Sequence, residues 1–92
     1  MLRDSYLQWM KEFRPEYLED LLKENRLDAH LDEKMAQVKH YGEILEKRGI
    51  NAWQIQELVT DSLMPSDQPE PEKKFSPEGK RLLKLWKAGT TA

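Results

Sequence analysis

The first 64 residues carry large hydrophobic side chains at intervals of three and four, with polar and charged residues between them. This spacing places the hydrophobic residues along one face of an α-helix, and no segment alternates in the manner of a β-strand. The pattern predicts helices over residues 3–13, 15–25, 28–48 and 52–64. We therefore expect an all-α fold in which residues 1–64 form a small helical bundle of four helices.

Residues at the expected helix ends support these boundaries. Pro15 suits the first turn of the second helix, and Asn25 is of the type that ends a helix in the left-handed conformation. Gly49 closes the third helix in the same way. Asn51 begins the fourth helix as an N-cap, with Gln54 three residues later in the arrangement of a capping box.

The third helix is too long for one short neighbour to cover. Its hydrophobic stripe extends from Leu27 to Leu45. A helix of about 21 residues spans about 30 Å, against about 15–20 Å for each of the other three. Either the first two helices line up end to end along it, or part of the stripe pairs with a second copy of the chain. The sequence leaves monomer and homodimer open.

The composition changes after the fourth helix. Residues 65–75 contain three prolines and no large hydrophobic residue up to Lys74, which is typical of an extended, flexible linker. Residues 76–88 then predict a short C-terminal helix, with Ser76 as its N-cap and Pro77 in its first turn.

The C-terminal helix is amphipathic and basic. One side gathers four hydrophobic residues, Leu82, Leu83, Leu85 and Trp86, and the other side carries Lys80, Lys84 and Lys87. We expect this helix to bind a protein partner, and three placements stay open. It can enter a groove of the partner, dock back on its own body over Trp53 and Met64, or lie on an anionic membrane surface.

The two ends of the chain differ in charge. Residues 1–64 hold 9 Lys and Arg against 13 Asp and Glu, whereas residues 73–87 hold 6 against 1. The C-terminal helix is therefore suited to an acidic surface, either that of its own body or that of an unidentified protein partner. The whole chain has a formal net charge of −2, which argues against a protein that mainly coats nucleic acid.

No catalytic or metal site is recognisable in the sequence. His30 and His40 are ten residues apart and do not share a helix face, so we expect no metal ion. The absence of Cys removes thiolate ligands and thiol nucleophiles. No glycine-rich phosphate loop and no carboxylate pair beside a hydrophobic pocket can be recognised. We therefore expect a protein that is not an enzyme and has no cofactor.

The N-terminal residues lack the basic region and hydrophobic core of a signal peptide. No hydrophobic run approaches the roughly 18 residues of a membrane span. We accordingly expect no transmembrane segment and a cytoplasmic location.

An alternative function rests on the junction of the third and fourth helices. Residues 44–59 look like the first two helices of a helix-turn-helix, with Lys47 and Arg48 available for phosphate and Asn51 and Gln54 of the base-reading type. No third helix follows directly, and the preceding helix is rich in carboxylates that repel phosphate. An atypical DNA-binding regulator is therefore the alternative to a protein-binding role, and nucleic acid is the less favoured partner.

The N-terminal half of the chain resembles a known family. The resemblance covers about residues 2–50 and is carried by the segments Arg3–Leu7, Glu12–Tyr17, Leu21–Leu22 and Asn25–Leu31 and by the amphipathic run to Gly49. These segments resemble the TnpV-like proteins encoded on bacterial transposons and integrative elements. The resemblance implies a small helical accessory protein and carries over no activity and no functional residues. We therefore expect a non-enzymatic accessory or regulatory protein of a bacterial mobile element that acts through protein–protein association.

Overall fold

The computed structural model describes residues 2–65 and 68–90, and within these ranges the chain is helical with no β-strand. The helices are α1 (Leu2–Phe13), α2 (Pro15–Lys23), α3 (Leu27–Lys47), α4 (Ala52–Leu63) and α5 (Pro77–Thr90). The all-α prediction is confirmed, and each helix begins and ends within two residues of its predicted boundary.

The residues predicted to end the helices have the expected conformations. Asn25, just beyond α2, has a φ of 57°, and Gly49, beyond α3, has a φ of 82°. Both lie in the left-handed region that stops a helix. The Asn51 side chain accepts a hydrogen bond of 2.9 Å from the backbone N–H of Gln54 and so caps α4.

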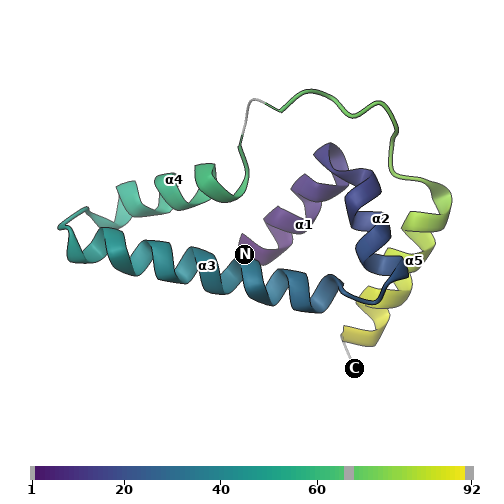
Figure 1. Ribbon diagram of the computed structural model, residues 1–92, viewed down its shortest axis with the longest axis horizontal. Coiled ribbons are helices and arrows are strands. Elements are labelled where there is room, and N and C mark those ends of the chain that lie inside the picture. Colours follow the sequence, from purple (N-terminus) through teal and green to yellow (C-terminus); the bar gives the residue numbers. More distant parts are fainter. Residues whose placement is uncertain (1, 66–67, 91–92) are drawn as a thin grey trace.

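The long helix α3 supports two separate groups of helices (Figure 1). Helices α1, α2 and α5 lie at its N-terminal half, and α4 runs back antiparallel along its C-terminal half. The helices expected to form one four-helix bundle are therefore split between two groups, one at each half of α3. The C-terminal half of the α3 stripe is covered by α4 and not by α1 and α2 in line, because the tight turn at Gly49 returns the chain directly onto α3.

The main core lies where α1, α2, α5 and the N-terminal half of α3 meet. Its most deeply buried side chains are Met10, Leu18, Leu27 and Leu31. The α3–α4 arm, defined here as residues 38–63, is packed much more thinly. Only Leu45 and Val59 are buried among its hydrophobic residues, and Val38 is half-buried.

The segment between α4 and α5 is non-helical in its described residues and runs over α1 and α2 (Figure 1). The indole N–H of Trp9 donates a hydrogen bond of 3.3 Å to the Pro65 carbonyl. The Arg14 guanidinium donates to the Gln68 side chain. Phe75 is 8% exposed and belongs to the main core. The described part of the predicted linker is thus attached to the body at both ends, while residues 66 and 67 lie outside the described ranges.

Helix α5 packs back onto the body, against α2. Of the placements left open by the sequence, docking on the body is the one in the structure, but the expected location over Trp53 and Met64 is wrong. Trp53 is 68% exposed, and Met64 packs at the edge of the main core. The reason is the path of the linker, which leads the chain across α1 and α2 and away from the outer side of α4.

Candidate partner-binding surfaces

The inner face of α5 makes a close contact with α2. The Ser76 hydroxyl accepts a hydrogen bond of 3.0 Å from the Gly79 N–H, as its predicted N-cap role requires, and itself donates to the Glu19 carboxylate. A Cβ atom at Gly79 would lie 2.7 Å from Cγ of Glu19 and 2.8 Å from a ring carbon of Phe75. Only glycine allows α5 to approach α2 this closely.

Further along α5, the contact is hydrophobic and then polar. Leu83 is 5% exposed and joins the main core. The indole N–H of Trp86 donates a hydrogen bond of 3.1 Å to Asp28 at the start of α3. Arg3 of α1 lies 3.6 Å from the same carboxylate, so three helices meet at Asp28.

The four hydrophobic residues predicted as one partner-binding face are divided: Leu83 enters the main core, whereas Leu82, Leu85 and Trp86 together line a hollow between α5 and the end of α2. Leu83 is buried, Leu82 and Trp86 are half-buried, and Leu85 is 61% exposed. The helix places most of this face against the chain's own α2, because the spacing of Gly79, Leu83 and Trp86 directs them to one side. Leu85 alone remains as an exposed hydrophobic contact on α5.

The outer face of α5 is basic. Lys80, Arg81 and Lys84 are exposed, and so is Leu85. At 3.6 residues per turn, Arg81 and Leu85 lie nearly opposite Leu83, and Lys84 and Lys80 lie on the flank that leads back toward Leu83. Lys87 is also exposed in the last turns of the helix. We refer to Lys80, Arg81, Lys84 and Leu85 as the basic face of α5. An acidic macromolecular surface is its natural complement.

Trp53 stands apart from α5, on the outer side of α4. It borders a shallow hollow that is also lined by Gln56, Glu57, Thr60 and Asp61. The indole is the most exposed of the large hydrophobic side chains that the structure describes as exposed. With two carboxylates beside it, this position suits a hydrophobic or cationic group of another molecule.

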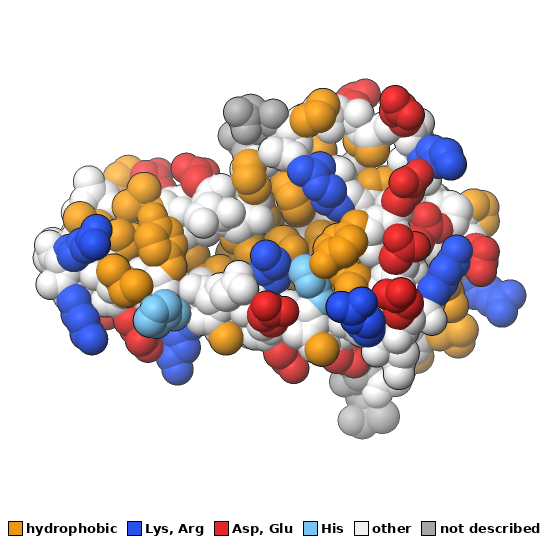
Figure 2. All heavy atoms as spheres, in the orientation of Figure 1, with side chains coloured by type: hydrophobic (Ala, Val, Ile, Leu, Met, Phe, Trp, Pro, Cys, Tyr) orange, Lys and Arg blue, Asp and Glu red, His pale blue; other side chains and the backbone are white. Residues whose placement is uncertain are grey.

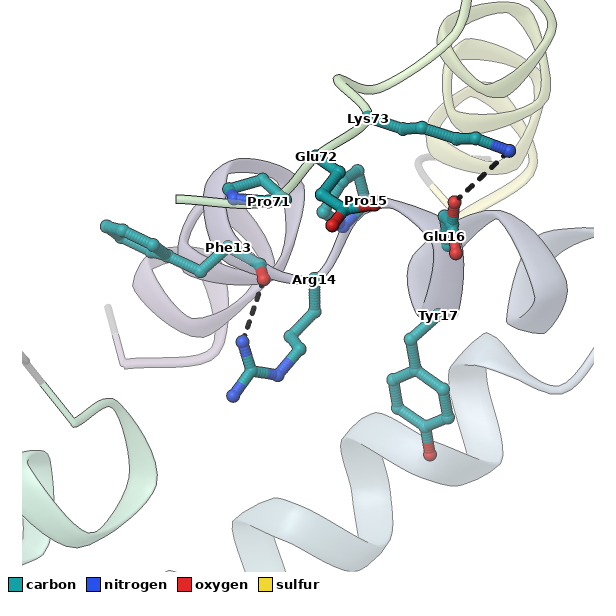
Figure 3. A pocket seen from close by; sticks show the side chains of 8 residues that line it. All are labelled: Phe13, Arg14, Pro15, Glu16, Tyr17, Pro71, Glu72 and Lys73. Atoms are coloured by element: carbon teal, nitrogen blue, oxygen red, sulfur yellow. Dashed lines mark hydrogen bonds and ion pairs between the residues drawn. The ribbon is translucent and has the colours of Figure 1, made fainter. Parts of the chain in front are cut away.

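A second hollow, of about 360 Å³, lies between the corner of α1 and α2 and the linker (Figure 3). Its charged side chains are held by the protein itself. Arg14 donates a hydrogen bond of 2.9 Å to the Phe13 carbonyl, and Lys73 forms an ion pair of 3.7 Å with Glu16. Tyr17 extends away from the linker toward α3.

His30 links three helices through two tyrosines. Its Nε2 lies 2.9 Å from the Tyr6 hydroxyl of α1, and its Nδ1 lies 3.3 Å from the Tyr17 hydroxyl of α2. Burial and then the nearby Lys34 lower the pKa of His30, with a smaller lowering by Arg26 and an opposing effect of Glu33.

Burial of Tyr6 and, to a smaller extent, the nearby Tyr17 raise the pKa of Tyr6 to about 12. Because both ring nitrogens of His30 already face tyrosine hydroxyls, the ring has no free nitrogen for a metal ion or substrate. Across residues 2–65 and 68–90, no group of three or more potential metal ligands comes together.

The residues of the DNA-binding alternative lie at the turn between α3 and α4. Lys47, Arg48, Asn51 and Gln54 are all exposed there. Besides the cap, the Asn51 amide donates a hydrogen bond of 3.3 Å to the Gln54 side chain, so these two groups are occupied with each other. After α4 the chain continues into the linker and α5 packs on α2, so no third helix adjoins this turn.

Comparison with protein-family models, curated proteins and solved structures finds no match to this chain. No helix in the described part of the chain is both long and apolar enough to cross a membrane.

Proposed function

We propose that the protein is a non-enzymatic accessory or regulatory protein that works by binding another protein. The resemblance of residues 2–50 to TnpV-like proteins supports a role on a bacterial mobile element. The residues proposed to bind the partner belong to α5, as the sequence suggested. Lys80, Lys84 and Leu85 were already among the residues suggested by the sequence, whereas Leu83 is buried in the main core.

The observation that carries the proposal is the basic face of α5. Lys80, Arg81 and Lys84 are exposed on α5 and have no ion pair among those found in residues 2–65 and 68–90. Glu19 of α2 lies where α5 docks, next to Ser76. The body thus holds α5 in place and leaves its positive charge directed outward.

A partner with an acidic surface fits this arrangement. Complementary charge speeds the encounter of two proteins and makes their binding sensitive to salt. Leu85, 61% exposed beside the basic residues, adds a hydrophobic contact once the partner has approached.

The test is affinity capture from the host cell followed by measured binding of the captured partner. Replacement of Lys80, Arg81 and Lys84 by Gln is expected to weaken binding at least tenfold at low salt and to flatten its salt dependence. The matched control replaces Lys23, Lys39 and Lys47, three exposed lysines on other helices, by Gln. Equal loss of binding in both triple variants would show that net charge matters and the basic face does not.

A DNA-binding regulator is the second candidate, favoured by the exposure of Lys47 and Arg48 together at the α3–α4 turn. Binding through phosphate contacts weakens steeply as salt is raised. A salt titration of binding to a duplex DNA, with Lys47→Gln and Arg48→Gln as variants, tests it. No binding of the duplex at low salt removes this candidate.

A further inference from the structure

The charged side chains of helix α4 are all negative. Its 12 residues include Glu57 and Asp61 and no Lys or Arg. Both carboxylates are exposed, stand about one helical turn apart and line the hollow beside the exposed Trp53. Neither takes part in an ion pair among those found in residues 2–65 and 68–90. We call Trp53, Glu57 and Asp61 the acidic face of α4.

Other charges of the arm come from α3 and from the α3–α4 turn. Glu43 and Glu46 add two exposed carboxylates, and Lys39, Lys47 and Arg48 oppose them. Lys47 and Arg48 precede α4, whereas its two carboxylates occupy its middle and its last turn. The sign of the charge therefore changes along the arm, from positive at the turn to negative toward the end of α4. Figure 2 shows Lys and Arg at the far left end of the molecule, where the turn lies, and Asp and Glu along the upper edge, where α4 lies.

The basic face of α5 has complementary features. Arg81 and Lys84 are three residues apart, close to the one-turn spacing of the α4 carboxylates. Leu85 adds an exposed hydrophobic side chain beside them, as Trp53 does on α4. Lys and Arg side chains also bind favourably over an indole ring.

One alignment of the two helices brings opposite charges together along their length. If α5 of a second copy runs parallel to α4 with Arg81 against Glu57, then Lys84 lies toward Asp61. In the other direction along α5 comes Glu78, the only carboxylate of this helix. Glu78 then lies toward the positive α3–α4 turn, so the charges that flank the two faces also meet opposite signs.

The two faces cannot meet within one chain. Helices α4 and α5 lie at opposite ends of the molecule (Figure 1). Burial of Leu83 in the main core and the hydrogen bond from Trp86 to Asp28 hold α5 on the body. The acidic face of α4 is therefore accessible to the basic face of another copy.

We propose that the acidic face of α4 binds the basic face of α5 in a second copy, so that copies associate head to tail. The inference rests on the proposed function and deepens it, because it names an acidic surface that the basic face binds. Such a contact is heterologous, so association continues beyond two copies unless a ring closes. Exposed ion pairs contribute little individually and are screened by salt, so the association is weak and salt-dependent.

An exchange of charges between the two faces tests the proposal. Sedimentation equilibrium of the full chain from about 10 μM to 1 mM should show association at low salt that declines at about 0.5 M salt. Glu57→Lys with Asp61→Lys should weaken association about tenfold or more, because like charges then face each other. Arg81→Glu with Lys84→Glu should weaken it similarly. An equal mixture of these two double variants should associate again, because each then meets a face of opposite charge.

The matched control is Asp20→Lys with Glu33→Lys, which makes the same change of charge at two exposed carboxylates on α2 and α3. It should associate as the wild-type protein does, and far-UV circular dichroism verifies that all variants remain folded. A wild-type protein that stays monomeric at low salt overturns the proposal. A mixture of the two double variants that stays dissociated, or equal weakening by the control, overturns it as well.

Failure of this inference can be separated from failure of the proposed function. The variant with Glu57→Lys and Asp61→Lys keeps α5 unchanged, so it should bind a captured acidic partner as the wild-type protein does. A monomeric wild-type protein that still binds its partner through the basic face of α5 would remove head-to-tail association and leave the proposed function in place.

Discussion

Gly79 of α5 and Glu19 of α2 pack so closely that a Cβ atom at position 79 would stand 2.7 Å from Cγ of Glu19. A helix normally loses about 1 kcal/mol of stability when Gly replaces Ala in its interior. Here the glycine lowers the intrinsic helix preference of α5 and in return permits its contact with the body.

Gly79→Ala is therefore expected to destabilise the protein. The methyl group must displace Glu19 and the Phe75 ring, and overpacking of this kind costs about 1–3 kcal/mol. Thermal unfolding measures the effect. Gly89→Ala is the control in the same helix, because a Cβ there meets nothing within 4 Å. If both variants raise the melting temperature alike, α5 is not packed on α2.

A second pair of variants compares two leucines of α5 that are two positions apart. Leu83 is 5% exposed and Leu85 is 61% exposed. Leu83→Ala should lower the free energy of unfolding by about 2–5 kcal/mol, as for a buried core leucine. Leu85→Ala should change it by no more than about 0.5 kcal/mol. Denaturant unfolding of both variants provides the measurement, and the reverse order would mean that α5 docks through its other side.

His30 should make the stability depend on pH below neutrality. Its pKa is lowered from 6.5 by burial, so below pH 6.5 the unfolded chain binds more protons at this residue than the folded chain does. The contribution of neutral His30 is complete above pH 6.5 and is lost as the pH falls toward the folded pKa. The positive charges that oppose its protonation are Lys34 and Arg26, and Glu33 acts in the opposite direction.

Denaturant unfolding at about pH 7.5 and about pH 5 tests this expectation. His30→Gln should reduce the difference in stability between the two conditions. The control His40→Gln alters an exposed residue outside this cluster and should retain the wild-type difference. An unchanged difference in His30→Gln would mean that His30 titrates alike in the folded and unfolded chains.

Tyr6 should show its effect in alkaline solution. Its pKa is raised from 10.0 to about 12 by burial, so the folded chain retains this proton after the unfolded chain has lost it. The stabilisation is complete below pH 10 and declines as the pH rises toward 12. Phenolate absorbance should show a late titration step that is absent from Tyr6→Phe. At neutral pH the same variant loses the hydrogen bond to His30, worth about 0.5–1.5 kcal/mol.

Gly42→Ala should stabilise the arm. A Cβ at this position would lie 3.7 Å from a methyl group of Ile55 and 4.0 Å from one of Val59, which is ordinary van der Waals contact. The helix gains about 1 kcal/mol from the replacement of an interior glycine. A rise in the melting temperature is expected, and a fall would indicate that α3 and α4 pack more closely than described.

The sequence predicted the helices well because their signals are local. The spacing of hydrophobic residues and the caps at Asn25, Gly49, Asn51 and Ser76 act within a few residues, and all four adopt the expected roles. How the linker and α5 pack depended on contacts between residues more than 50 positions apart, for which local spacing gives no information. Trp9 with Pro65 and Trp86 with Asp28 are examples.

Two signals for the packing of α5 were nevertheless present in the sequence. Gly79 stands in the first turn of a helix where a better helix former would be expected, which often marks a close approach of backbones. Phe75 is the one large hydrophobic residue between Met64 and Leu82. Both belong to the contact with α2. The cluster of Tyr6, His30 and Tyr17 had no comparable signal, because its members come from three helices.

The return of α5 to α2 also sets an order of events during synthesis. Helix α2 has only nine residues, and the helix that covers it is made after the whole α3–α4 arm. An isolated helix of that length is marginal in water. The N-terminal part of a nascent chain therefore keeps some of its hydrophobic surface exposed to water until Leu83 has left the ribosome. Folding should then proceed more slowly than in a helical protein of the same size built from neighbouring contacts.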